Sequence, residues 1–109
     1  MNYSNRQEVK GWFEQNGDTG WHTLIDIIYD NKPDQVVIIE VFEKYAALEV
    51  RYTGEDEDYE DLVKSIRTIS QCMCQICGES GRHSLLDGWE TTLCDKHFES
   101  SGAKHKIRR

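Results

Sequence analysis

Apolar residues recur at helical spacing in two stretches of the N-terminal third. The first stretch begins at a pair with capping-box spacing and keeps its apolar side chains on one face: Ser4, Gln7, Val9, Trp12 and Phe13. The second stretch has the same periodicity: Trp21, Leu24, Ile25, Ile28 and Tyr29. This pattern predicts one short helix that ends before Gly17 and a second that ends before Pro33, since proline disfavours helix in the residue before it.

The middle of the chain has the alternation that is typical of β-strands. Residues 36–42 are apolar on both alternating faces apart from Glu40, and residues 48–52 alternate apolar and charged side chains. We therefore expect two strands of one hairpin, of which the first is the more deeply buried.

A third helical pattern begins inside an acidic run. Residues 55–61 hold six carboxylates, and helical spacing continues through and beyond them: Tyr59, Leu62, Val63, Ile66, Ile69 and Met73. The helix macrodipole favours negative charge at a helix N-terminus. A solvated helix start is therefore the favoured interpretation of the acidic run, and a dedicated binding surface is the alternative.

The composition is that of a soluble globular protein. Hydrophobic residues make up 38% and charged residues 30% of the 109 positions, and the middle section is too apolar for a disordered chain. A chain of this length most often forms one domain. We expect a single domain at 1–109, with a helix-sheet part at 1–71, a zinc module at 72–99 and a basic tail at 100–109.

The formal charge of −7 is unevenly distributed along the chain. Residues 104–109 carry four of the 13 basic residues, which leaves a charge of −11 on the rest. Nucleic-acid binding gains affinity when Lys and Arg neutralise phosphates. Such a negative surface therefore disfavours nucleic-acid binding by the body of the protein.

The sequence has no evident targeting or membrane-spanning segment. The first residues lack the apolar stretch of a signal peptide, and the longest aliphatic run, at 36–39, is too short to cross a bilayer. We expect a cytoplasmic protein. In that reducing compartment, a group of Cys and His residues binds metal more often than it forms disulfides.

Two short pairs of candidate metal ligands lie about one hairpin apart, Cys74-x-x-Cys77 and Cys94-x-x-His97. Zn²⁺ accepts thiolate and neutral imidazole in a closed tetrahedron, and a gap of two residues lets both side chains of a pair reach one ion. The spacing predicts one structural zinc ion held by Cys74, Cys77, Cys94 and His97. Four protein ligands leave no open position for catalysis.

The residues around these pairs indicate a treble-clef arrangement. Gly78 can take a positive φ, which lets backbone amides turn toward the thiolates. Residues 78–93 are long enough for two strands that turn near Asp87-Gly88, after which the second pair would lie in the first turn of a helix. The predicted fold is therefore α+β, a small antiparallel sheet with helices and a C-terminal treble-clef-like zinc module. A zinc ribbon is the alternative.

Cys72 offers a second register for the first pair. Cys74 is preferred because its spacing to Cys77 fits a tight knuckle. Cys72 falls at the end of the third predicted helix, where it would be a small buried residue or a free thiol.

The common catalytic signatures are absent from the sequence. It contains no Gly-rich phosphate loop, no G-x-S-x-G elbow and no H-E-x-x-H helix. His22, His83 and His105 have no spaced partner and are interpreted as loop, surface or tail residues. Glu40 and Glu43 are interpreted as edge or solvent-facing strand residues. We predict that the protein is not an enzyme; a treble-clef nuclease using His83 would also need a second metal-binding residue and a basic groove.

Four blocks of residues follow one another in order: Gly20-Trp21-x-x-Leu24-Ile25, Glu43-Lys44-Tyr45-Ala46-Ala47-Leu48, Cys74-x-x-Cys77-Gly78-x-x-Gly81 and Gly88-Trp89-x-Thr91-Thr92-Leu93-Cys94-x-x-His97. Over residues 20–98 this order resembles an uncharacterised family of small zinc-binding proteins from phages, prophages and bacteria. The resemblance implies a phage or mobile-element origin and zinc ligands at the four residues above. It implies no catalytic residues.

The second block departs from the family pattern, which typically has Gly-Gly where this chain has Ala46-Ala47. Alanine tolerates a positive φ poorly, so a tight glycine-type turn is not assumed between the two strands.

These features favour a non-enzymatic, zinc-stabilised protein that binds another protein. A host or competing-element protein is the expected partner, for example a host defence factor that is inhibited. The alternative is a nucleic-acid-binding zinc protein whose basic C-terminal tail contacts phosphate. A basic surface would favour the alternative, and a continuous acidic or apolar face would favour protein binding.

Overall fold

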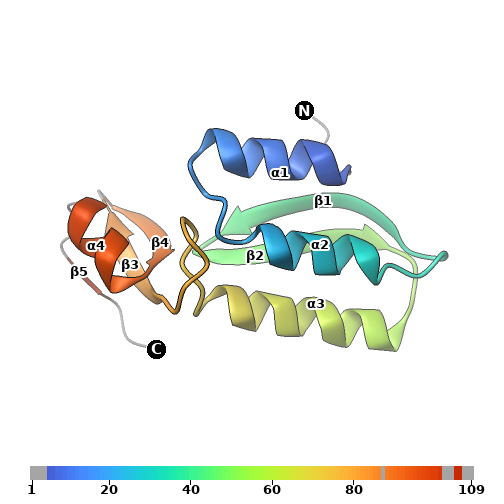
Figure 1. The fold of residues 1–109 in the computed structure, drawn as a ribbon. Helices are drawn as coiled ribbons and strands as arrows, with labels where there is room; N and C mark the ends of the chain where they lie inside the picture. The colour runs from blue at the N-terminus through green and yellow to red at the C-terminus, as the bar shows by residue number, and fades with distance from the viewer. Residues whose placement is uncertain (1–4, 87, 102–104, 107–109) are drawn as a thin grey trace.

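The computed structural model of the protein describes residues 5–86, 88–101 and 105–106 (Figure 1). Its elements are α1 (Arg6–Gln15), α2 (His22–Asp30), β1 (Val37–Lys44), β2 (Ala47–Thr53), α3 (Glu57–Ser70), β3 (Arg82–Leu86), β4 (Trp89–Leu93), α4 (Asp95–Ser101) and β5 (His105–Lys106). The predicted α+β class is confirmed, with a helix-sheet part followed by a small C-terminal module.

The two parts lie end to end along an elongated molecule with principal extents of 43 × 27 × 21 Å. Helices α1, α2 and α3 lie along the antiparallel β1–β2 hairpin and pack against one of its faces, and the tip of that hairpin points toward the C-terminal module (Figure 1). The module has a three-stranded sheet in the order β4-β3-β5, and α4 follows β4.

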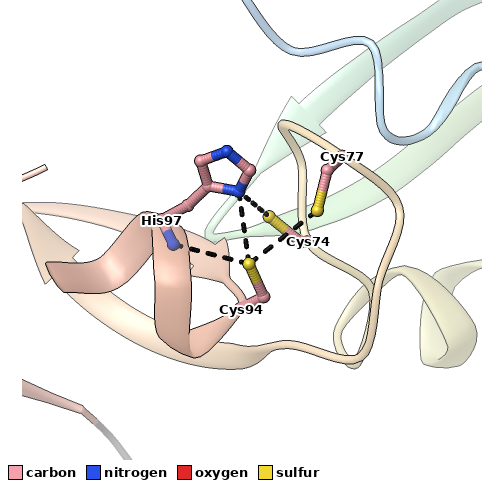
Figure 2. Close-up of side chains that lie close together, drawn as sticks. All are labelled: Cys74, Cys77, Cys94 and His97. Atoms are coloured by element: carbon pink, nitrogen blue, oxygen red, sulfur yellow. Dashed lines mark hydrogen bonds between the residues drawn. The ribbon is translucent and has the colours of Figure 1, made fainter. Parts of the chain in front are cut away.

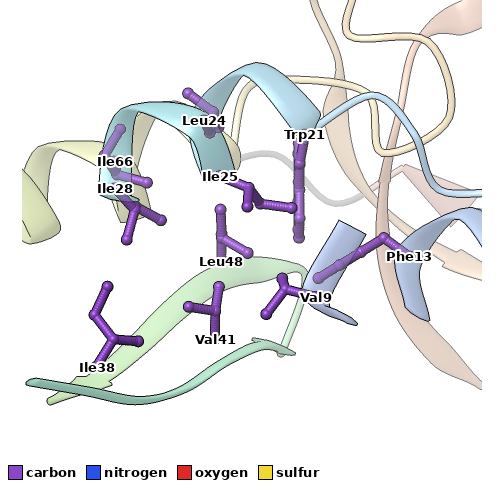
Figure 3. Close-up of a cluster of buried hydrophobic side chains, with 10 residues drawn as sticks. All are labelled: Val9, Phe13, Trp21, Leu24, Ile25, Ile28, Ile38, Val41, Leu48 and Ile66. Atoms are coloured by element: carbon purple, nitrogen blue, oxygen red, sulfur yellow. The ribbon is translucent and has the colours of Figure 1, made fainter. Parts of the chain in front are cut away.

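The core lies between the three helices and one face of the hairpin (Figure 3). Each helix and both strands contribute buried side chains to it: Val9, Phe13, Trp21, Leu24, Ile25, Ile28, Ile38, Val41, Leu48 and Ile66. The helical spacing of the apolar residues is the reason, because it places them on one face of each helix. The three helices predicted from this spacing are confirmed.

The first strand is not the more deeply buried of the two, so that prediction was wrong, since β1 and β2 each have two buried residues. Ile38 and Val41 are buried, whereas Val37 is 59% and Ile39 is 38% exposed. The register with β2 shifts between Ile38 and Glu40, and this bulge turns both Ile38 and Val41 toward the helices although they are three residues apart. The helices cover only one face of the hairpin, so its other face stays open.

Side-chain caps fix the starts of α1 and α3. The cap of α1 is Asn5, whose side chain accepts hydrogen bonds from the backbone N–H groups of Gln7 and Glu8. Ser4, the first residue of the pair with capping-box spacing, lies outside the described residues. Asp56 caps α3 by accepting from the N–H of Tyr59, and three further acids occupy the first turn. The acidic run is thus a helix start, as predicted.

The β1–β2 hairpin turns tightly without glycine. Tyr45 and Ala46 have φ values of 52° and 66°, and two positive φ values between paired Lys44 and Ala47 are the mark of a type I′ turn. The hydroxyl of Thr92 donates to the carbonyl of Ala46 at 2.9 Å. The sequence did not allow this turn to be assumed, and the structure forms it with alanine where the turn contacts the C-terminal module.

Part of the predicted basic tail at 100–109 forms regular secondary structure. Ser100 and Ser101 belong to α4, and His105–Lys106 pairs with β3 as its outer strand. The remainder of the predicted basic tail, at 102–104 and 107–109, lies outside the described residues.

Candidate metal centre

The structure brings together all four residues that the spacing singled out. The sulfur atoms of Cys74, Cys77 and Cys94 and a ring nitrogen of His97 lie within 4.8 Å of one another. Figure 2 shows the four side chains converging from the knuckle at 74–77 and from the start of α4. In the part of the chain that the structure describes, no other group of three or more His, Cys, Asp or Glu side chains is close enough to hold one ion.

The distances suit a tetrahedral ion. The Sγ atoms of Cys77 and Cys94 are 3.8 Å apart, and Nδ1 of His97 lies 3.2 Å from Sγ of Cys94 and 3.6 Å from Sγ of Cys74. Four ligands in a tetrahedron around zinc, with bonds of about 2.3 Å to sulfur and 2.0–2.1 Å to nitrogen, would be about 3.5–3.8 Å apart. The cluster can therefore hold a metal ion with little rearrangement.

The first pair of ligands lies in a knuckle that the backbone shapes. Gly78 has a φ of 82°, and its N–H donates to the carbonyl of Cys74 at 2.9 Å. The N–H of Cys74 donates to the carbonyl of Glu79 at 2.7 Å, which closes the loop. Gly78, which directly follows Cys77, therefore has the positive φ that the sequence predicted.

The second pair lies at the start of α4. Cys94 directly precedes the helix and His97 is in its first turn, so the two side chains emerge on the same side. The backbone N–H of His97 points at Sγ of Cys94, 3.5 Å away. Knuckle, hairpin and helix thus follow in the predicted treble-clef order.

Two thiols of the cluster have shifted pKa values. The backbone N–H of His97 is the main cause that lowers the pKa of Cys94 to about 7, and hydrogen bonds from the His97 ring and neighbouring thiols add to it. The backbone N–H of Glu79 lowers the pKa of Cys77, but desolvation and the adjacent cysteines together raise it more. Cys94 is therefore the readier of the two thiols to become the thiolate that binds a metal.

Burial distinguishes the two possible registers of the first pair, although Cys77 itself is exposed. Cys74 is completely buried, whereas Cys72 is exposed and lies outside the cluster. The register that uses Cys72 is thus not the one the fold adopts. The exposed position also shows that Cys72 is a free thiol and not a small buried residue.

Close backbone contacts dock the knuckle onto the helix-sheet part. The N–H of Gly20 donates to the carbonyl of Gln75 at 2.7 Å, and the indole N–H of Trp21 donates to the carbonyl of Met73 at 2.9 Å. Gln75 also bonds the backbone of Thr92 through both its own N–H and its side chain. The Gly20-Trp21 block therefore couples the core to the metal centre.

The remaining candidate residues lie elsewhere. His22 contacts the carbonyl of Lys10, and Glu40 pairs with Arg51 at 3.0 Å. His83 is buried in β3, with Nε2 2.6 Å from Oε1 of Glu90. His105 lies in β5, and its side chain is not among those described. None of the described histidines other than His97 belongs to the metal cluster.

A cleft between the two parts of the molecule was missed at the sequence level. It has a volume of about 640 Å³. Its walls include two tryptophans and three acids: Trp12, Trp89, Asp18, Glu43 and Glu90. Glu43, which was interpreted as an edge or solvent-facing residue, lies at the end of an edge strand but is half-buried opposite Leu48. No local pattern joins these residues, since they come from distant segments.

Two of the three acids in the cleft have raised pKa values. Desolvation raises the pKa of Asp18 to about 6, against a smaller lowering by a hydrogen bond from Gln75. Desolvation also raises the pKa of Glu43, and the negative charges of Asp18 and Glu90 raise it further. The carboxylates are therefore close enough to repel one another.

Comparisons with protein-family models, curated proteins and solved structures gave no match. Within the described ranges, no helix has both the length and the apolar composition needed to cross a membrane. The resemblance to a phage and bacterial family stays a prediction from sequence.

Proposed function

We propose that this is a non-enzymatic protein that binds another protein and is stabilised by one structural zinc ion. The donor set supports zinc, because three thiolates and one imidazole form a soft, tetrahedral site that suits Zn²⁺ far better than Mg²⁺ or Ca²⁺. The free cysteines fit a reducing compartment such as the bacterial cytoplasm.

The exposure of Trp89 is the observation that best supports the proposal of protein binding. Trp21 is completely buried, but Trp89 is 78% exposed on β4 at the edge of the cleft. Tryptophan is among the residues that contribute most to protein interfaces, because it buries a large apolar area when a partner covers it. The acidic body, with its charge of −11 outside residues 104–109, would attract a basic partner.

The partner we propose is a host or competing-element protein, and inhibition of a host defence factor is the corresponding role. The resemblance to a phage and prophage family supports this part of the proposal. The acidic charge and the exposed tryptophan support binding itself and do not depend on the origin of the chain.

Nucleic-acid binding is the second candidate, and the position of Lys106 favours it. Strand β5 places this residue on the three-stranded sheet, next to β3, so part of the basic segment is held by the folded module. Four cations at 104–109 would give a salt slope no steeper than about −4.

One experiment separates the two candidates. The wild-type protein and two variants are used as bait in host lysate, and their binding to DNA and RNA is measured across a range of salt concentrations. Trp89→Ser removes the exposed tryptophan. The quadruple variant Lys104→Gln, Lys106→Gln, Arg108→Gln, Arg109→Gln removes the charge but keeps the backbone of β5.

We expect a specific protein to be retained by the wild type and the quadruple variant and lost by Trp89→Ser. Submicromolar binding to nucleic acid at physiological salt that the quadruple variant loses would overturn protein binding and establish the second candidate.

A further inference from the structure

The cleft at the junction of the two parts is a shaped, acidic cavity with aromatic walls. Asp18 comes from the turn after α1, Glu43 from the end of β1 and Glu90 from β4. Its volume of about 640 Å³ is in the range of ligand-binding cavities, which is about 300–1,000 Å³. Three separate segments thus direct carboxylates into one cavity.

No Lys or Arg among the described residues forms an ion pair with the acids of the cleft. In the part of the chain with described coordinates, the ion pairs of Lys and Arg involve acids elsewhere: Asp26, Asp30, Glu40, Glu49 and Glu60. Asp18 has a hydrogen bond from Gln75, and Glu90 lies beside His83. The charge of this surface therefore complements a cationic ligand.

We propose that the cleft binds an arginine side chain of the partner protein, an inference that rests on the protein-binding function proposed above. The guanidinium would lie among Asp18, Glu43 and Glu90, and Trp89 would cover it.

The spacing of the carboxylates favours a guanidinium over a metal ion. Among the described residues, no three carboxylates lie close enough together to hold one metal ion. The three acids of the cleft are therefore too far apart to bind a metal ion jointly. A guanidinium is planar and carries five N–H donors, so it can bond to acceptors that are separated from one another.

The tryptophans favour a guanidinium over an ammonium group. Trp12 packs edge to face against Phe13, with ring centroids 4.9 Å apart, and this contact fixes one wall of the cleft. The mostly exposed Trp89 forms the other side. Arginine stacks on aromatic faces and is more weakly hydrated than lysine, so it loses less on entering such a site.

The titration of the acids is consistent with a cationic ligand. The raised pKa values of Asp18 and Glu43 mean that charging both acids is unfavourable in the free protein. A bound guanidinium would favour their ionised forms and so be coupled to their deprotonation. Acidic groups whose ionised forms destabilise the folded protein, and which converge in one cavity, are typical of binding sites.

The test is an NMR titration of the full-length, zinc-loaded protein with an acetylated and amidated Gly-Arg-Gly peptide. The indole N–H signals of Trp12 and Trp89 report on the cleft, and that of Trp21 reports on the fold. Two further peptides replace arginine with citrulline, which has a similar shape but no charge, or with lysine.

A matched pair of variants isolates the cleft from the overall charge. Asp18→Asn with Glu43→Gln removes two charges from the cleft, and Glu57→Gln with Asp58→Asn removes two from the exposed start of α3. Should the cleft variant fail to fold, Trp89→Ser takes its place, since that side chain is mostly exposed.

We expect saturable shifts of the Trp12 and Trp89 signals with the arginine peptide. Citrulline or the cleft variant should weaken binding by about tenfold or more, the effect of losing one charge-assisted hydrogen bond. The α3 variant should bind as the wild type does.

Equal binding of the citrulline or lysine peptide, or an equal loss in both double variants, would overturn the inference. The titration contains no partner protein, so its failure would leave protein capture by the wild type unaffected. Conversely, failure to capture a protein would not alter the result with the peptide.

Discussion

Gly20 lies so close to Cys74 that there is no room for a side chain between them. A Cβ atom at Gly20 would be 2.0 Å from the carbonyl oxygen of Cys74 and 2.6 Å from the amide nitrogen of Gly78. Both atoms belong to the backbone of the metal-binding knuckle, so they cannot move without moving the ligands. The α1–α2 turn is in this way part of the support of the metal centre.

Gly20→Ala should therefore destabilise the protein and weaken its hold on the metal. Overpacking of this kind costs about 1–3 kcal/mol. Urea unfolding would measure the stability, and transfer of zinc to a coloured chelator would measure metal retention. Gly11→Ala is the control, because no atom lies within 4 Å of a Cβ there and alanine in a helix is favoured over glycine by about 0.5–1 kcal/mol. Equal effects of the two substitutions would contradict the close contact.

Substitution of metal ligands should remove the zinc that we propose. Elemental analysis of the wild type should find about one zinc per chain, and the double variant Cys74→Ser, Cys94→Ser should lose it, because two thiolates are gone from the cluster. Cys72→Ser is the matched control and should keep the metal, since Cys72 lies outside the cluster. Full zinc content in the double variant would show that other residues bind the ion.

Removal of zinc should disorder the C-terminal module more than the helix-sheet part. The binding free energy of structural zinc, on the order of 10–16 kcal/mol in isolated fingers, is largely coupled to folding. The principal core uses residues from Val9 to Ile66 and contains no metal ligand. Amide spectra before and after chelation should lose the dispersed signals of residues 72–99 and shift the indole signal of Trp21, which bonds Met73. Unchanged spectra after verified zinc removal would mean that packing alone holds the module.

The ionisation of Asp18 should make stability depend on pH. Its pKa is raised to about 6 by desolvation, so the folded state binds this proton more tightly than the unfolded state does. The stability that this proton contributes is present below the ordinary pKa of 3.8 and is lost as the pH rises toward and through 6. Asp18→Asn should therefore gain stability over the wild type as the pH is raised from 5 to 8.

The comparison of variant with wild type cancels the pH dependence of zinc binding, which both proteins share. Urea unfolding at several pH values gives the difference. A constant difference across this range would show that Asp18 titrates normally in the folded protein.

The strain of the β1–β2 turn should be relieved by asparagine. Tyr45 has a φ of 52° but is 66% exposed, so substitution removes little buried surface. Since asparagine tolerates the left-handed region better than tyrosine does, Tyr45→Asn should stabilise the protein by about 0.5–1 kcal/mol. Tyr45→Phe keeps the ring and the backbone preference and should have no such effect. Equal stability of the two variants by thermal unfolding would show that the turn is unstrained.

The sequence by itself determined the features that depend on near neighbours along the chain. The faces of the three N-terminal helices follow from apolar residues spaced about one turn apart, and the acidic start of α3 follows from the helix dipole. The pairing of Cys74 with Cys77 and of Cys94 with His97 follows from gaps of two residues, which one turn of backbone can close. These properties are local, so a pattern of residues is enough to predict them.

Only the tertiary structure decided the features that need distant segments. The bulge at Ile39 depends on register with β2, and the turn at Ala46 is held against the C-terminal module by a hydrogen bond from Thr92. The cleft joins Asp18, Glu43 and Glu90 across most of the chain, and the need for glycine at position 20 arises from the knuckle folded against it. Packing between distant segments fixes the bulge, the turn, the cleft and the need for glycine at position 20. Close contact and shared desolvation exist only once the chain has folded.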